Sequence, residues 1–229
     1  MPEVHKHAHP NLFWLKTKDG STRLATINAE PGKKVYTERL VSKDGIEYRT
    51  FDPHKSKLGS AIMKELQNFP FIEGSKILYL GAASGTTVSH ISDMIGADGS
   101  IFAIEFSARS LRDLVVVAER RQNIIPILAD ARFPEEYSFA VPLVDVVYED
   151  VAQPRQAEIL KDNVQTYLKK DGYFFFAVKA RSIDVTKDPK VIYEEVSKDL
   201  ESAGLTILEK IDIEPFEKDH IVIVGQKKF

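Results

Sequence analysis

The sequence predicts an α/β fold in which a small N-terminal antiparallel β domain precedes a Rossmann-like, mostly parallel sheet. Short runs between residues 11 and 51 alternate apolar and polar side chains, as strands with one buried face do. From Ile77 onward, short apolar runs alternate with helical stretches, which is typical of βαβ units. The 229 residues suit one α/β domain with a small appendage, and we expect the division to separate residues 1–54 from residues 55–229.

The N-terminal part ends in a hairpin and a helix. Asp44 and Gly45 separate two alternating runs, and both residue types tolerate the positive φ that a tight hairpin turn requires. Pro53 then interrupts the pattern, and residues 56–67 place apolar side chains four apart, as on one face of a helix. The expected strands cover residues 23–27, 35–41 and 46–51.

The second part is expected to hold five strands, each followed by a helix or a loop, and then a final strand pair. Only a short polar segment separates the last two strands, at residues 206–213 and 220–225, so we expect them to pair antiparallel at one edge of the sheet. The preceding strands are expected at residues 77–80, 101–104, 124–128, 144–148 and 173–178, with helices starting near residues 86, 108, 156 and 189.

Composition narrows the class of protein. The chain has no cysteine, which excludes disulfides, thiolate metal sites and a cysteine nucleophile, and we expect a cytoplasmic location without membrane attachment. The formal net charge is −3, whereas proteins that bind nucleic acid unaided carry a basic excess. His5, His7 and His9 alternate at the N-terminus, and we favour a frayed end or an edge strand over a metal site for them.

A glycine-containing turn follows the first strand of the second part. Gly81 and Gly85 flank this turn before a helix, a geometry in which backbone and helix N-terminus approach a nucleotide closely. The turn lacks the lysine of a P-loop and does not fit Gly-x-Gly-x-x-Gly, so dinucleotide binding is disfavoured. Glu105, Asp130 and Asp150 end the next three strands and would face one crevice, although each alone is better explained as a helix cap or a solvated carboxylate.

Three segments resemble the fibrillarin family: residues 81–90, 148–154 and 179–184. The resemblance extends over nearly the whole chain, and the lack of a glycine/arginine-rich tail favours the archaeal form. It implies a methyltransferase that moves a methyl group from S-adenosylmethionine to ribose 2′-hydroxyls of rRNA and tRNA, as the catalytic subunit of a box C/D guide ribonucleoprotein. The partners implied are a Nop-domain scaffold protein, a kink-turn-binding ribosomal-type protein, the guide RNA and the target RNA.

The resemblance also implies site residues, with no metal among the ligands. Phe51 stands where the family often has tryptophan, a departure that concerns the approach to the site. The catalytic tetrad carried over by position is Lys57, Asp150, Lys179 and His220. The implied cofactor contacts are Gly81, Ala83, Thr86, Thr87, Glu105, Phe106, Asp130, Ala131, Asp150 and Gln153.

The implied chemistry mainly requires positioning of the reactants, since the sulfonium activates its own methyl group. A ribose hydroxyl is a poor nucleophile and needs a base or a cation beside the developing alkoxide. Lys179 is suited to either role, and the identity of the base stays open. Without the resemblance, Lys57 would be interpreted as a solvated helix lysine and His220 as a structural residue.

Two other functions compete with this interpretation. The first is another methyltransferase, acting on protein glutamine or on a small molecule, although no inserted lid is visible in the sequence. The second is a non-catalytic ribonucleoprotein scaffold, for which loss of the tetrad or of the glycine turn would be the mark. Both motifs are present.

Overall fold

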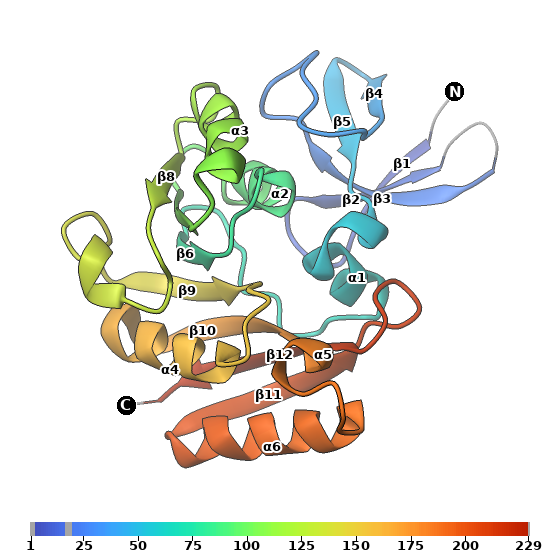
Figure 1. The fold of residues 1–229 in the computed structure, drawn as a ribbon. Helices are drawn as coiled ribbons and strands as arrows, with labels where there is room; N and C mark the ends of the chain where they lie inside the picture. The colour runs from blue at the N-terminus through green and yellow to red at the C-terminus, as the bar shows by residue number, and fades with distance from the viewer. Residues whose placement is uncertain (1–2, 17–19, 229) are drawn as a thin grey trace.

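The computed structural model describes residues 3–16 and 20–228, and it contains two β-sheets (Figure 1). The smaller sheet is antiparallel, in the order β1-β2-β3-β5-β4. Asp44 and Gly45 form the predicted hairpin turn with φ of 52° and 80°. His5 lies in the edge strand, as expected. The strands are β1 (Glu3–Lys6), β2 (Leu12–Lys16), β3 (Thr22–Ile27), β4 (Leu40–Lys43) and β5 (Ile46–Thr50).

The larger sheet has the order β11-β12-β10-β9-β6-β7-β8. Five adjacent strands of this sheet, β10, β9, β6, β7 and β8, pair parallel, so their carboxyl ends share one edge of the sheet. The predicted antiparallel pair of β11 and β12 is confirmed, with β12 inserted between β10 and β11. The strands are β6 (Lys76–Leu80), β7 (Ser100–Glu105), β8 (Ile124–Leu128), β9 (Val144–Glu149), β10 (Leu168–Lys179), β11 (Leu205–Asp212) and β12 (His220–Lys227).

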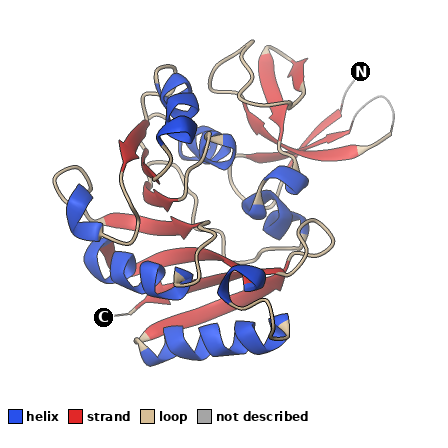
Figure 2. Ribbon diagram, viewed as in Figure 1, coloured by secondary structure: helices blue, strands red, loops and turns tan. Residues whose placement is uncertain are grey.

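Helices cover both faces of the larger sheet (Figure 2). Helices α1, α2 and α3 share a core with one face, and α4 and α6 share a core with the other. No helix among the described residues is long and apolar enough to cross a bilayer. The helices are η1 (Pro53–Lys55), α1 (Lys57–Met63), α2 (Thr86–Ile95), α3 (Ala108–Ala118), η2 (Pro134–Tyr137), α4 (Gln156–Tyr167), α5 (Ala180–Ile183) and α6 (Pro189–Ser202).

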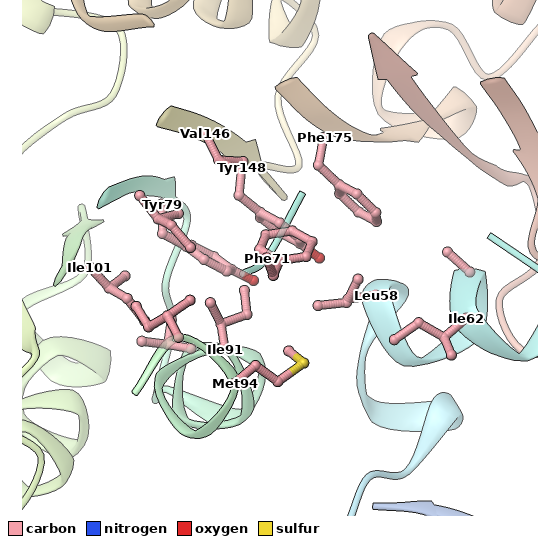
Figure 3. Packing of buried hydrophobic residues seen from close by; sticks show 14 of the residues in the cluster. Leu58, Ile62, Phe71, Tyr79, Ile91, Met94, Ile101, Val146, Tyr148 and Phe175 are labelled. Carbon is pink, nitrogen blue, oxygen red and sulfur yellow. The ribbon is translucent and has the colours of Figure 1, made fainter. Parts of the chain in front are cut away.

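Alternation along β6 explains how one strand serves both cores. Tyr79 packs on the face that carries α1 and α2, whereas Leu78 and Leu80 pack on the face that carries α4 and α6. Tyr148 stacks between Tyr79, at a centroid distance of 4.2 Å, and Phe175, at 4.6 Å (Figure 3). This aromatic row lies across three adjacent strands and fixes the centre of the sheet beneath the glycine turn.

The strand predicted at residues 35–41 is wrong over its first part, because only Leu40–Lys43 forms a strand there. The buried Glu38 carboxylate accepts hydrogen bonds from the backbone N–H groups of Val35 and Tyr36, both at 2.8 Å. A side chain that accepts hydrogen bonds from nearby backbone N–H groups satisfies them without a neighbouring strand. The segment therefore turns before it joins β5.

The helix predicted at residues 56–67 is confirmed at its start but ends at Met63. The Ser56 side chain caps the first turn by accepting from the Gly59 N–H at 3.2 Å. Glu65 has a φ of 65°, in the left-handed region, which ends the helical path. Leu66 nevertheless reaches the core, since the turn returns it to the apolar face.

A buried charged network joins the two sheets. Asp93 of α2 accepts from Arg49 of β5 at 2.6 Å and from Arg121 at 2.5 Å. Arg49 also pairs with Glu38 at 2.9 Å, and the Asp93, Arg49 and Glu38 side chains are inaccessible to solvent. Burial lowers the pKa of neighbouring His90 well below its ordinary value, and the two arginines act in the same direction. The division at residue 54 stays a prediction.

Candidate functional site

The glycine turn between β6 and α2 is shaped by close backbone contact. Gly81 has a φ of 82°, and a Cβ on it would lie 2.4 Å from the backbone oxygen of Asp150. Gly85 has a φ of 91°, and a Cβ there would meet Leu114 of α3 at 2.9 Å. The sequence therefore needs glycine at both positions, because a side chain would be strained and would push the strand ends apart.

Glu105 ties this turn to the end of β7. One carboxylate oxygen accepts from the Ala83 N–H and the other from the Ser107 N–H, both at 2.7 Å. Each carboxylate oxygen has a second acceptor site, so Glu105 keeps capacity for hydroxyl donors of a ligand. Ala83 itself has a φ of 48°, a conformation rare for a residue with a side chain. Glu105 thus stabilises the turn and faces the crevice at the same time.

A cavity of about 330 Å³ opens at the carboxyl ends of β6, β7, β8 and β9. Its volume lies in the range of small-ligand sites. All of the predicted cofactor contacts line it except Thr86 and Thr87: Gly81, Ala83, Glu105, Phe106, Asp130, Ala131, Asp150 and Gln153. The other lining residues were not predicted from the sequence, and most of them are apolar. They are Ile104, Ala129, Arg132, Val151, Ala152 and Ile159.

Thr86 and Thr87 lie at the first turn of α2, away from the cavity lining. The Thr87 hydroxyl donates to the Ser56 hydroxyl at 3.0 Å and is buried. Thr87 therefore connects α2 to the N-terminus of α1. The roles of both threonines toward a ligand stay predictions.

The rim of the cavity combines an exposed ring with carboxylates. Phe106 is 72% exposed, so its ring is accessible to a ligand at the rim. Asp130 pairs with Arg132 at 2.5 Å, and hydrogen bonds from Arg132 lower the pKa of Asp130 below its ordinary value. The cavity thus offers an apolar floor, one exposed aromatic face and carboxyl oxygens as acceptors, which suits an adenosyl group with its ring and hydroxyls.

The predicted tetrad gathers at the same edge of the sheet as two pairs. Lys57, the first residue of α1, contacts Asp150 with 3.2 Å between Nζ and Oδ1. Lys179 ends β10 and lies opposite His220, which begins the antiparallel β12. Because β12 runs the other way, its first residue lies where the parallel strands end. Within residues 3–16 and 20–228, no carboxylate lies within 4.0 Å of the Lys179 ammonium.

Main-chain contacts hold Lys179 and His220 in place. The buried Gln156 side chain accepts from the Lys179 N–H at 3.1 Å and donates to the Lys179 carbonyl at 3.2 Å. His220 is buried, with Nδ1 2.7 Å from the Lys218 carbonyl. Neither anchor uses the Lys179 ammonium. The cation is thus positioned by backbone and left available to a substrate.

Glu149, next to Asp150, was not singled out from the sequence. Its side chain is fully buried, and neither carboxylate oxygen has a hydrogen-bond partner among the described residues. Burial raises the pKa of Glu149 well above its ordinary value, and the charge of Asp150 acts in the same direction. The protein therefore buries a carboxyl group next to Asp150 in surroundings that favour its protonated form.

We expect Glu149→Gln to gain stability relative to the wild type as pH rises. The folded-state pKa lies above the unfolded value near 4.5, so the wild type loses stability once pH exceeds that value, whereas glutamine does not titrate. The difference should grow by about 1.4 kcal/mol for each unit by which the pKa is raised. Urea unfolding between about pH 5 and about pH 7 measures it. The exposed Glu201→Gln is the control, and a pH-independent difference would show that Glu149 is ionised in the folded state.

Comparison with known proteins decides the family. The family model described as Fibrillarin matches residues 4–229 of this chain. The chain belongs to the fibrillarin family. It is 55% identical over 227 residues to the fibrillarin-like rRNA/tRNA 2′-O-methyltransferase of Pyrococcus abyssi, covering 99% of this chain and 100% of that one. The resemblance inferred from the three sequence segments is confirmed.

Two solved fibrillarin structures share the fold. Aeropyrum pernix fibrillarin, solved with natively bound S-adenosyl-L-methionine, superposes with a TM-score of 0.91 at 46% identity, covering 98% of this chain and 100% of that one. Fibrillarin in the fibrillarin/Nop5p complex gives a TM-score of 0.85 at 38% identity, covering 97% and 100%. The predicted fold, a Rossmann-like methyltransferase sheet with a small N-terminal β domain, is confirmed.

Proposed function

We propose that this protein transfers a methyl group from S-adenosylmethionine to ribose 2′-hydroxyls of rRNA and tRNA. The observation that carries the proposal is the position of Asp150. Its side chain lines the cofactor-type cavity and contacts Lys57, so the ligand site and the cationic pair share one residue. The rRNA/tRNA 2′-O-methyltransferase of Pyrococcus abyssi, with 55% identity, supports the same reaction for this chain.

The cavity residues suit the cofactor. Glu105 would accept from ribose hydroxyls, Asp130 from the adenine amino group, and Phe106 would cover the ring; Gly81 leaves space that a Cβ would fill. When bound, S-adenosylmethionine supplies a methyl group activated by a positively charged sulfur.

The tetrad would prepare the ribose hydroxyl. Lys57 neutralises Asp150 at one side of the site, which leaves Lys179 as the cation free to meet the hydroxyl oxygen. Lys179 either accepts the hydroxyl proton or donates a hydrogen bond to the developing alkoxide. His220 lies opposite Lys179 in the β10–β12 register and limits the space in which the lysine moves.

We propose the partners from the same family. A Nop-domain scaffold is supported by the fibrillarin/Nop5p complex, whose fibrillarin covers 97% of this chain in superposition. The net charge of −3 favours RNA being held by other subunits, for which a kink-turn-binding protein and a box C/D guide RNA are the proposed components. A cytoplasmic location is proposed with them.

The experiment that tests the function is methyl transfer from labelled S-adenosylmethionine to a target RNA, with and without the assembled guide particle. We expect site-specific label in the RNA only with the particle, because the free protein carries no basic excess. Label in protein glutamine would support the alternative methyltransferase, and assembly without any label would support the scaffold. Efficient site-specific methylation by the protein alone would overturn the proposed division of labour.

We expect Glu105→Ala to weaken cofactor binding by about 1.5–3 kcal/mol, the scale of a hydrogen bond to a charged group. Glu105→Gln is the second variant: it keeps the side-chain shape and removes the charge, but its single carbonyl oxygen accepts from only one of the Ala83 and Ser107 N–H groups. Calorimetric titration with S-adenosylmethionine measures the loss, and the exposed Glu136→Ala is the control. Unchanged affinity in Glu105→Ala would remove this residue from the site.

A further inference from the structure

A groove on the N-terminal part of the molecule starts beside the tetrad. It is a hollow of about 360 Å³ lined by residues of β3, the turn before β4 and η1, among them Arg23, Tyr36 and His54. His54 belongs to η1, which leads through Ser56 into Lys57. The groove and the tetrad are therefore separated by only a few residues of chain.

The same end of the groove reaches the β11–β12 loop. The rings of His54 and Phe216 meet edge to face with 5.2 Å between centroids. Phe216 lies in the loop that leads to His220, and Figure 1 shows this loop beside α1. The end of the groove at His54 therefore lies against the loop that leads to His220.

The hollow continues across β2. A shallower depression of about 500 Å³ shares Thr22 and Met63 with the first and adds His5 and Trp14. Trp14 is half-buried and is the only tryptophan in the chain. Its ring lies 5.0 Å from that of His7, centroid to centroid. The far end of the groove is therefore aromatic.

Two arginines and two acidic residues line the hollow, and Arg23 is a cation that it exposes to a ligand. Arg23 is exposed, and no carboxylate of the described chain pairs with it. Arg39 also lines the hollow, and Lys55 borders it, donating to the Thr37 hydroxyl at 2.6 Å. Of the two acidic lining residues, Glu38 is neutralised by Arg49 behind it, while Asp52 caps η1.

We propose that this groove binds an unpaired segment of the RNA strand that carries the target ribose, with a phosphate at Arg23 and a base against Trp14. The proposal rests on the proposed function. Cations that meet phosphates, combined with an aromatic platform for the bases, let proteins hold single-stranded nucleic acid without reading its sequence. A base in a duplex would offer no free face to Trp14, so the segment must be unpaired. The residues that line the groove come from separate segments of the chain, so no contiguous sequence motif indicates the groove.

The fluorescence of Trp14 reports RNA binding directly, because this residue is the only tryptophan in the chain. Titrating the full-length protein with a single-stranded oligoribonucleotide should quench its fluorescence in a saturable way. Arg23→Glu should weaken the binding about tenfold or more and reduce the salt dependence, by a slope of about 0.7 for the lost phosphate contact. Lys198→Glu, an equal charge change on an exposed position of α6, should leave affinity within about twofold. A Trp14→Phe variant, followed by anisotropy of labelled RNA, tests the stacking while keeping an aromatic core contact.

Three results would overturn the proposal: no quenching, equal quenching by a fully paired duplex, or equal quenching by polyglutamate, which would indicate an acidic protein partner. The guide particle separates this proposal from the proposed function. With Arg23→Glu, methylation should need several-fold more target RNA while the single-turnover rate at saturating RNA stays normal. Unchanged RNA dependence would overturn the groove alone, whereas an inactive wild-type particle would overturn the methyltransferase function without affecting the quenching result.

Discussion

Asp93→Asn is expected to destabilise the folded protein by about 3–5 kcal/mol, the scale of breaking a buried ion pair by removing one partner. Asp93 is the carboxylate between two buried arginines, with Arg49 at 2.6 Å and Arg121 at 2.5 Å. Asparagine keeps the shape but removes the charge. Arg121 then loses its only ion-pairing carboxylate in the described chain, while Arg49 retains Glu38.

Urea denaturation of the cofactor-free protein measures this effect. Asp98→Asn is the matched control, because Asp98 is exposed just beyond α2 and the same change there should alter stability by less than about 0.5 kcal/mol. Folded proteins are stable by only about 5–15 kcal/mol, so the Asp93 variant should lose a large part of its margin. A loss equal to that of the control would show that the network is not holding the two sheets together.

This network illustrates what the sequence did not reveal. Arg49, Asp93 and Arg121 occupy positions that look like ordinary solvated charges on strand and helix surfaces. They become buried only because the N-terminal sheet packs against α2, and this packing brings together residues up to 93 positions apart, as in the hydrogen bond from Arg121 to Asn28. Local sequence patterns do not indicate such long-range contacts. The same holds for Glu149, which is fully buried at the end of β9.

The cofactor turn was predictable because its determinants are local. A strand, a glycine turn and a helix are contiguous in sequence, and parallel strands end at one edge whatever their lateral order. Glu105, Asp130 and Asp150 therefore line one cavity, as the strand ends indicated. Side-chain direction was less accessible: Thr87 belongs to the same turn but points to Ser56.

Phe51 shows a departure from the family that the structure explains in part. Its ring stacks on His90 of α2 with 4.0 Å between centroids and is buried. The position therefore packs against the helix that begins at the cofactor turn, rather than opening toward the cavity. Neighbouring His54, in contrast, is exposed in the groove, and a role for either residue in the approach to the site stays a prediction.

Lys179→Ala is expected to lower the rate of methyl transfer by about 10²-fold or more, the usual scale for removing a general base or an electrostatic stabiliser. Cofactor affinity and particle assembly should stay normal, because Lys179 does not line the cavity. Its backbone bonds to Gln156, at 3.1 and 3.2 Å, do not depend on the side chain. The strand end should therefore remain in place in the alanine variant.

Single-turnover methylation of a guide-matched RNA, with each variant assembled into particles, measures the rate. Lys170→Ala is the control, since Lys170 is an exposed lysine of the same strand, far from its carboxyl end. Lys179→Arg separates the two roles: a guanidinium keeps the charge but does not release a proton in this pH range, so poor rescue indicates a base and good rescue indicates alkoxide stabilisation. A near-normal rate for Lys179→Ala would exclude both roles and transfer the chemistry to Lys57 or His220.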